Sequence, residues 1–200
     1  MKRSGLNSFK KFWSDDSPKS WLIFLFVVLP LLFVLVKFVF FPGLNLISGS
    51  SQTLVVIETA SMHHDGSLGN ILYFPINFNN YWAQGKDWYL SRNISKEEFG
   101  NFPFKTGMEI GDIVVLTKRG EIKVGDVIVF EAGEKRPIIH RVVKITVIDG
   151  RKIYSTKGDA NPSQLSFETS ISENKIIGKA IARFPRLGYL KVIFAKILGL

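Results

Sequence analysis

Residues 136–162, RPIIHRVVKITVIDGRKIYSTKGDANP, decide how this chain folds. Two runs rich in β-branched residues, 138–148 and 151–157, flank the dipeptide Asp149-Gly150. Such runs favour β-strands, and Asp-Gly between them strongly favours a two-residue hairpin turn. We therefore predict a long antiparallel β-hairpin at this point.

The hairpin places two chemically active side chains near each other. A two-residue turn pairs Ile148 with Arg151, and antiparallel pairing carries this register back along both strands. Unless a β-bulge intervenes, His140 then lies opposite Asp159, with their Cβ atoms about 4.5–5.5 Å apart. The opposite face would be the core side and carries the apolar residues Val143, Ile145 and Val147.

Three further β-branched runs, 54–59, 110–116 and 124–130, precede the hairpin, so the fold class we expect is mostly β. The last two runs each contain an early Gly-Asp pair, at Asp112 and Asp126. We interpret both aspartates as turn residues at the start of a strand. Asp159, which also follows a glycine, therefore needs support beyond its local motif.

Residues 21–41, WLIFLFVVLPLLFVLVKFVFF, predict a transmembrane helix because they are apolar except for Lys37 and long enough to span about 30 Å. Basic residues crowd the segment 1–20, whereas 42–57 carries no charge. The positive-inside rule then predicts a cytoplasmic N-terminal tail over 1–20 and an extracytoplasmic β-domain over 42–186. A cleaved signal peptide, whose apolar part usually runs only about 7–15 residues, and a buried soluble helix are the alternatives.

The composition excludes several functional classes. The formal net charge is +9 over 200 residues, but no basic cluster interleaved with aromatic residues indicates nucleic-acid binding. A solvated surface that faces anionic lipid explains the charge more simply. The absence of cysteine excludes disulfides, thiol catalysis and cysteine-based metal sites, and we expect neither a cofactor nor a metal.

Ser61 follows the first β-run and is the candidate nucleophile. An imidazole can take a hydroxyl proton and return it to a leaving amine, while a carboxylate holds the imidazole in position. Ser61, His140 and Asp159 would thus form a Ser-His-Asp arrangement. Taken singly, the three residues also fit a strand-end serine, a histidine on a solvated sheet face and a turn aspartate.

Five segments, taken in order after a membrane anchor, resemble signal peptidase I: TASM (59–62), IGDIVVL (110–116), VGDVIVF (124–130), RPIIHRVV (136–143) and STKGDANP (155–162). The resemblance is to the branch of archaea and the endoplasmic reticulum. It implies a signal-peptidase-like β catalytic domain with Ser61 as nucleophile, His140 as general base and Asp159 as its support. It also implies an oxyanion hole from the Ser61 N–H and the Thr59 hydroxyl. The bacterial branch uses a lysine base, for which Lys157 is the only nearby candidate.

The function implied is that of a membrane-anchored serine endopeptidase that removes N-terminal signal peptides on the outer side of the membrane. Its partners would be preproteins with small residues before the cleavage site, the lipid bilayer and the protein-export channel. The chain would be a single-pass protein of the cell membrane. The alternatives are a catalytically silent membrane-anchored binding domain and a regulatory serine peptidase of the related repressor-like fold.

The sequence departs from the family pattern after the nucleophile. His63 and His64 stand where family members usually continue to a proline. With Asp65 they suggest a metal site, but neighbouring residues of an extended chain point in opposite directions, so we expect surface histidines. A further family acid usually follows the KGDAN segment, and Glu168 is the nearest acidic residue.

Two segments lie outside the resemblance. Residues 65–106 form an aromatic-rich insertion, which would either seat the domain on the bilayer or, as we favour, bury its aromatic residues in a core of its own. Ser95 and Glu98 predict a helix cap within it. Residues 187–200 are too short for a second span, and we predict a membrane-associated amphipathic helix there.

Overall fold

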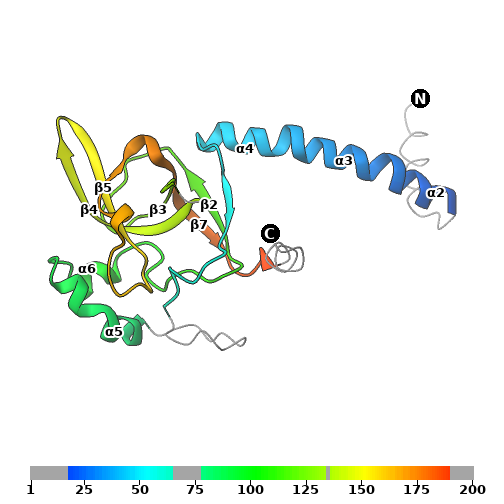
Figure 1. The fold of residues 1–200 in the computed structure, drawn as a ribbon. Helices are drawn as coiled ribbons and strands as arrows, with labels where there is room; N and C mark the ends of the chain where they lie inside the picture. The colour runs from blue at the N-terminus through cyan, green and yellow to red at the C-terminus, as the bar shows by residue number, and fades with distance from the viewer. Residues whose placement is uncertain (1–17, 65–77, 134–135, 190–200) are drawn as a thin grey trace, which may run out of the picture. The chain divides into compact units, whose positions relative to one another are not determined.

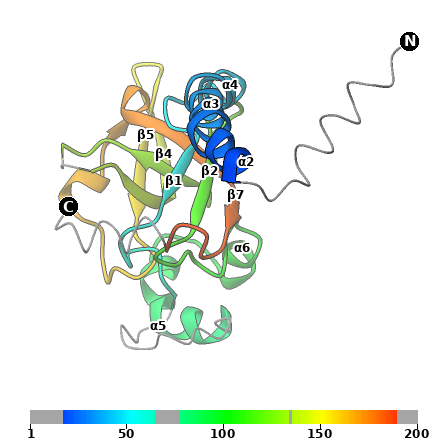
Figure 2. The ribbon, with the colours of Figure 1, turned by 90° about the vertical axis from the view of Figure 1, so that its right-hand side faces the viewer.

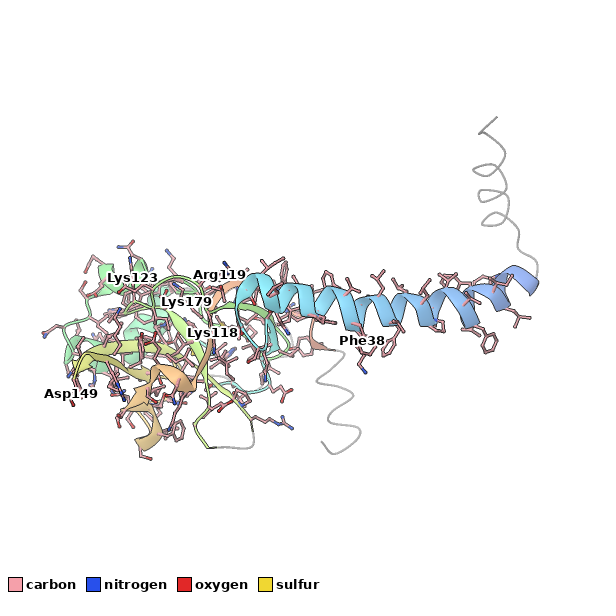
Figure 3. All side chains as sticks on the ribbon, turned by 90° about the horizontal axis from the view of Figure 1, so that it is seen from above. Phe38, Lys118, Arg119, Lys123, Asp149 and Lys179 are labelled. Atoms are coloured by element: carbon pink, nitrogen blue, oxygen red, sulfur yellow. The ribbon has the colours of Figure 1, made fainter. Side chains whose placement is uncertain are left out.

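The computed structural model describes residues 18–64, 78–133 and 136–189, in two units, Met1–Ile47 and Ser48–Leu200. Within the described part, one helix, Trp21–Ser48, is long and apolar enough to cross a membrane. None of its apolar window is buried, and its side chains, Phe38 among them, project outward (Figure 3). The helix continues past the predicted end at Phe41. Its consecutive segments are α2 (Pro18–Ile23), the π-helical η1 (Phe24–Val28), α3 (Leu29–Leu35), the π-helical η2 (Val36–Phe40) and α4 (Phe41–Ser48).

The second unit is built on one antiparallel seven-stranded sheet in the order β1-β2-β7-β3-β4-β5-β6 (Figure 1). The predicted mostly-β fold class is confirmed. The strand β7 was not predicted, yet it lies between β2 and β3 near the middle of the sheet. The strands are β1 (Leu54–Val56), β2 (Ile113–Thr117), β3 (Val127–Phe130), β4 (Ile138–Ile148), β5 (Arg151–Lys157), β6 (Ile171–Ser172) and β7 (Ile176–Phe184).

Both faces of the central strand β3 are buried. Val127 and Val129 join a cluster with Met62 and Leu116, whereas Ile128 and Phe130 join a second cluster on the other side of the sheet. Successive side chains of a strand point to opposite faces, so a strand that is apolar at every position can hold two cores at once. The sheet thereby provides a fixed frame for the residues at its ends.

The two Gly-Asp segments are turns, as predicted. The carboxylates of Asp112 and Asp126 each accept a hydrogen bond from the backbone N–H three residues earlier, at 2.9 and 2.8 Å. The preceding glycines, Gly111 and Gly125, have φ of +87° and +94°, which disfavours any residue with a Cβ. These two aspartates therefore serve turn formation.

The predicted hairpin forms between β4 and β5. Asp149 and Gly150 both have positive φ, 50° and 74°, and Ile148 pairs with Arg151. The predicted core row is wrong at its outer end, because Val147 is 65% exposed. The hairpin tip, marked by Asp149, projects beyond the rest of the sheet and so leaves the core (Figures 1 and 3).

The described part of the insertion contains two helices, α5 (Phe78–Leu90) and α6 (Lys96–Gly100), which lie together at one end of the sheet (Figures 1 and 2). Its aromatic residues form a core of their own, which includes Val143 of β4. The Ser95 hydroxyl accepts the Glu98 N–H at 3.1 Å, so the predicted cap is confirmed. The remainder of the insertion, 65–77, and residues 190–200 of the predicted C-terminal helix lie outside the described residues. The core members are Tyr81, Trp82, Tyr89, Ile94 and Phe99, with Phe78, Trp88, Phe102 and Val124 packed against them.

Candidate active site

The segment that carries Ser61 is fixed by backbone hydrogen bonds to two distant parts of the chain. The Ser61 carbonyl accepts the Ala160 N–H at 2.9 Å, and the Met62 carbonyl accepts the Met108 N–H at 2.9 Å. The Met62 side chain is fully buried, whereas Ser61 itself is half-buried. Ser61 is therefore held in place by its backbone while its hydroxyl can still meet a substrate.

Two groups near Ser61 suit the stabilisation of a developing oxyanion. The hydroxyl oxygens of Thr59 and Ser61 lie 3.4 Å apart, although the predicted strand 54–59 ends at Val56 and both residues lie in the bend and turn that follow it. The Ser61 N–H donates to no acceptor in the part of the chain that the structure describes. A free N–H and a neighbouring hydroxyl are the kind of donors that form oxyanion holes.

His140 is buried in β4, opposite Ile128 of β3, and its two ring nitrogens face different partners. Its Nδ1 lies 2.5 Å from Oε1 of Glu168, a close contact without the alignment of a hydrogen bond. Its Nε2 faces Gly158: a Cβ added to that glycine would lie 2.8 Å from Nε2 and 2.9 Å from the Ser61 carbonyl oxygen. The imidazole thus stands between an acid and the nucleophile segment.

The predicted pairing of His140 with Asp159 is wrong because the hairpin contains a β-bulge. Lys144 pairs with Ser155 in the predicted register, but Arg141 pairs with Lys157, one residue out of step. The shift lies at Val143, whose side chain packs into the aromatic core of the insertion. A bulge moves every residue beyond it by one position, which removes Asp159 from the place opposite His140.

Glu168, and not Asp159, makes the carboxylate contact with His140. It ends the 3₁₀ turn η3 (Ser166–Glu168) and its side chain is fully buried. Oε1 accepts the Gly158 N–H at 3.2 Å and Oε2 accepts the Leu165 N–H at 2.6 Å. Two backbone donors therefore fix the carboxylate that contacts Nδ1 of His140.

Asp159 has a different set of partners. Its buried carboxylate accepts hydrogen bonds from Arg141 Nη2 at 2.7 Å, Arg141 Nε at 2.9 Å and His64 Nε2 at 2.7 Å. Burial alone would raise the pKa of Asp159, but the Arg141 guanidinium and His64 lower it far below its usual range. Asp159 is thus an ionised, fully paired carboxylate beside the site.

The prediction of surface histidines after Ser61 is also wrong, since His63 and His64 are both buried. Nδ1 of His63 lies 2.6 Å from Oε2 of Glu109, whereas Nε2 of His64 contacts the carboxylate of Asp159. Burial lowers the pKa of His64, and the nearby Asp159 carboxylate only partly opposes this. Among the described residues no group of three His, Cys, Asp or Glu side chains could hold a metal ion.

Lys157 faces the insertion. Its Nζ donates to the carbonyl oxygens of Gly158 at 3.1 Å and Asp159 at 3.4 Å, and lies 5.1 Å from the ring centres of Trp88 and Tyr89. Burial lowers its pKa to about 8. Because this amine is engaged by two carbonyls and two rings, it is a poorer candidate than His140 for the base of Ser61.

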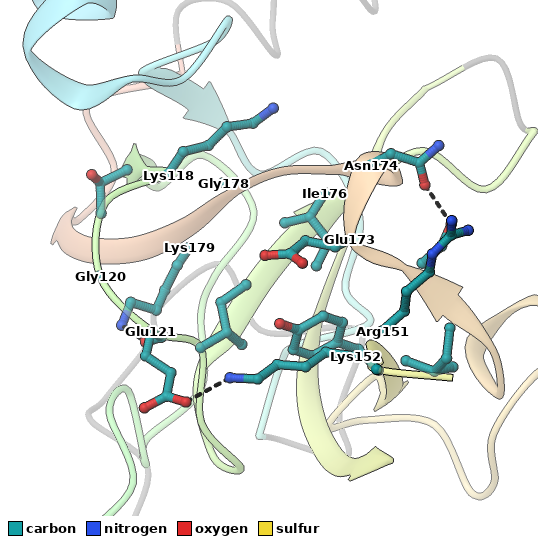
Figure 4. A pocket seen from close by; sticks show the side chains of 16 residues that line it. Lys118, Gly120, Glu121, Arg151, Lys152, Glu173, Asn174, Ile176, Gly178 and Lys179 are labelled. Carbon is teal, nitrogen blue, oxygen red and sulfur yellow. Dashed lines mark hydrogen bonds and ion pairs between the residues drawn. The ribbon is translucent and has the colours of Figure 1, made fainter. Parts of the chain in front are cut away.

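A large hollow of about 1150 Å³ lies elsewhere on the sheet, beside the β4–β5 hairpin (Figure 4). None of Ser61, His140 and Glu168 lines it. Its wall includes an ion pair between Lys152 and Glu121 at 2.6 Å. The residues of the proposed chemistry, Ser61, His140 and Glu168, therefore lie outside this hollow.

Comparison with known proteins finds relatives of the kind that the sequence motifs resemble. The signal peptidase complex catalytic subunit SEC11 of Lachancea thermotolerans is 37% identical over 92 residues, which cover 41% of this chain and 55% of that protein. The chain is a homologue of signal peptidase catalytic subunits. SEC11 of Komagataella phaffii is 27% identical over 171 residues, covering 80% of this chain and 76% of the relative, and SEC11 of Eremothecium gossypii is 26% identical over 167 residues, covering 80% and 75%. No protein-family model matches the chain.

This relationship agrees with the resemblance carried by the segments around Ser61 and His140. Sequence interpretation missed three contacts that shape the site of this signal peptidase homologue: those of His64 and Arg141 with Asp159, and that of Glu168 with His140. Only Glu168 had a signal, as the nearest acid after the KGDAN segment. His64 follows His63 and Arg141 follows His140 in the sequence. This adjacency does not reveal that both side chains bind Asp159.

Proposed function

We propose that this protein is a membrane-anchored serine endopeptidase that removes N-terminal signal peptides from exported preproteins. The observation that carries the proposal is the placement of His140, with Glu168 on one ring nitrogen and the Ser61 segment beyond the other. The homology to signal peptidase catalytic subunits supports the same function independently.

In the mechanism we propose, Nε2 of His140 accepts the Ser61 hydroxyl proton as Oγ attacks the carbonyl carbon of the scissile bond. Glu168 supports the imidazolium that forms. The Ser61 N–H and the Thr59 hydroxyl donate to the oxyanion of the tetrahedral intermediate. His140 then returns its proton to the leaving amine, the C–N bond breaks, and water hydrolyses the acyl-enzyme in a second cycle of the same steps.

The substrate would bind as an extended strand beside the Ser61 segment. That segment follows β1, which is an edge strand of the sheet. An edge strand has unpaired backbone groups, so a peptide can gain affinity from main-chain hydrogen bonds and specificity from alternate side chains. Small residues before the cleavage site fit such shallow contacts. The preprotein is therefore the partner that the proposed reaction requires.

The helix Trp21–Ser48 would hold the enzyme in the membrane across which its substrates are exported. The basic N-terminal tail favours a cytoplasmic N-terminus and an extracytoplasmic catalytic unit. Confining enzyme and substrate to one bilayer raises the rate at which they meet. Its relatives are named as subunits of a signal peptidase complex, so we propose that this chain also works beside partner subunits, close to the export channel.

The test is cleavage of a preprotein with an Ala-x-Ala site by the full chain in detergent. We expect Ser61→Ala and His140→Ala to abolish cleavage, because each removes a group that bonds to or exchanges a proton with the substrate. Ser163→Ala, at an exposed serine between Asp159 and Glu168 in the chain, is the matched control and should retain full activity. Undiminished cleavage by Ser61→Ala would overturn the proposal, and loss of activity in Lys157→Ala but not His140→Ala would reassign the base.

A further inference from the structure

The Asp159 carboxylate is the meeting point of three parts of the chain. Arg141 donates from β4, His64 donates from the segment after the nucleophile, and the Tyr89 hydroxyl donates from helix α5 at 3.4 Å. The side chains of Asp159, His64 and Arg141 are completely buried. A carboxylate with this many charged and neutral donors has a single strongly preferred position.

The backbone on either side of Asp159 touches the two proposed catalytic residues. On one side, the Ala160 N–H donates to the Ser61 carbonyl at 2.9 Å. On the other side, Gly158 packs so closely that an added Cβ would lie within 3 Å of both His140 Nε2 and the Ser61 carbonyl oxygen. A displacement of Asp159 would therefore shift Gly158 and Ala160, and with them the distance between Ser61 and His140.

His64 completes a second link between the same two segments. It lies three residues after Ser61, and its Nε2 donates to Asp159 at 2.7 Å, while Ala160 bonds to Ser61 directly. A side-chain bond and a backbone bond, set three residues apart on one segment and one residue apart on the other, fix both the distance and the rotation of the segments. The backbone bond alone would leave the rotation free.

The insertion keeps His64 in this position. The rings of His64 and Tyr81 stack with centroids 3.5 Å apart and an angle of 5° between their planes. The Tyr81 hydroxyl donates to the Asp159 carbonyl at 3.2 Å and lies 2.9 Å from the Tyr89 hydroxyl. Nδ1 of His64 makes no hydrogen bond within the described residues, so we assign the ring proton to Nε2, the nitrogen that faces Asp159.

We propose that His64 is a positioning residue of the active site, which, clamped by Tyr81 of the insertion, holds Asp159 so that the backbone of residues 158–160 sets Ser61 against His140. The proposal rests on the proposed peptidase function. It also gives the aromatic insertion a role in catalysis that does not require it to touch the substrate.

The experiment compares His64→Phe with His64→Gln in the full chain, using the Ala-x-Ala preprotein. Phenylalanine keeps a ring over Tyr81 but cannot donate to Asp159, whereas glutamine restores a donor without the ring. We expect His64→Phe to lower kcat by about 10- to 100-fold with KM within twofold of wild type, since a displacement near 1 Å costs about this much. His64→Gln should recover most of the loss. His63→Phe, which removes the neighbouring buried histidine, is the matched control.

All rates are taken per folded molecule, at a temperature where circular dichroism shows every variant fully folded. A His64→Phe enzyme with wild-type kcat, or a His64→Gln enzyme as impaired as His64→Phe, would overturn the positioning role. If His64→Phe does not fold, His64→Asn replaces it, because the shorter side chain of asparagine cannot reach Asp159. The His64→Asn enzyme should then be slower than the His64→Gln enzyme, and equal rates of the two would overturn the proposal. Failure of the peptidase function itself is distinguishable, because the wild type would then not cleave.

Discussion

Nδ1 of His140 lies 2.5 Å from Oε1 of Glu168, and both side chains are buried. The acid reaches the imidazole because the turn Ser166–Glu168 folds back onto β5, and the N–H of Gly158, directly after that strand, donates to the same oxygen. A carboxylate in this place holds the imidazole in one orientation and stabilises its protonated form. Glu168, and not the nearby Asp159, is thus the acid that can act directly on His140.

Replacing Glu168 by glutamine should therefore lower kcat strongly. An amide keeps the shape but loses the charge that favours the imidazolium, and in comparable triads this costs up to about 10⁴-fold. We expect Glu168→Gln to lose at least about 10²-fold in preprotein cleavage, and Glu168→Asp to have an activity between those of the wild type and Glu168→Gln. Glu173→Gln, at an exposed glutamate in the next turn, serves as control. Full activity of Glu168→Gln would show that another group supports His140.

Gly158→Ala should inactivate the enzyme, because its methyl group would displace His140 and Ser61 from each other. The added Cβ would lie 2.8 Å from His140 Nε2 and 2.9 Å from the Ser61 carbonyl oxygen, both closer than contact distance. Because catalysis depends on the spacing of these groups, we expect kcat to fall about 10²-fold or more. Gly150→Ala is the comparison: its Cβ meets no atom within 4 Å, so its positive φ should cost stability and leave cleavage per folded molecule unchanged. Equal activities of the two variants would contradict this view of the site.

The comparison of sequence with structure shows where local rules end. The β4–β5 hairpin was predictable because Asp149 and Gly150 set their own backbone conformation. The bulge was not, since it depends on Val143 finding its place in an aromatic core built by residues some 40–65 positions earlier in the chain. One such tertiary contact changed the register and with it the partner of His140.

The same limit applied to the site. Candidate roles for Ser61, Thr59 and His140 could be named from the sequence, because each lies in a short motif that resembles the family pattern. Glu168 could not be placed, because its position depends on the path of an irregular loop after Asp159. The strand β7 was missed since glycine and lysine interrupt its apolar pattern, although both neighbouring strands need it for pairing.

Thr59→Val should test the oxyanion donor. Valine keeps the branched shape but removes the hydroxyl that lies 3.4 Å from Ser61 Oγ. Removal of one such donor typically lowers kcat by about 10²–10³-fold with little change in ground-state binding. We expect a loss near the lower value, because Thr59 is exposed and water can partly replace it. Thr59→Ser retains a hydroxyl and should stay within tenfold of wild type; if the two variants were equally active, the hydroxyl would have no role.

The ion pair of Arg141 with Asp159 should dominate local stability. Arg141→Met leaves a buried carboxylate without its main counter-charge, which costs about 3–5 kcal/mol of unfolding free energy. The double variant Arg141→Met with Asp159→Asn removes both charges, so its loss should be smaller than the sum of the single losses by at least about 1 kcal/mol. Urea denaturation in detergent measures all four proteins. Additive losses would show that the two side chains do not interact.

Lys157 should make stability depend on alkaline pH. Burial lowers its pKa to about 8 from 10.5, so between these values the unfolded chain binds more protons than the folded protein. The free energy of unfolding then rises with pH, because the folded state no longer has to bury a charged amine. Between pH 7.5 and 10 we expect the wild type to gain about 2 kcal/mol relative to Lys157→Met, which lacks the titrating group. Lys144→Met, at an exposed lysine of β4, should follow the wild type over the same range. A pH-independent difference between wild type and Lys157→Met would mean that the amine is solvated in the folded protein.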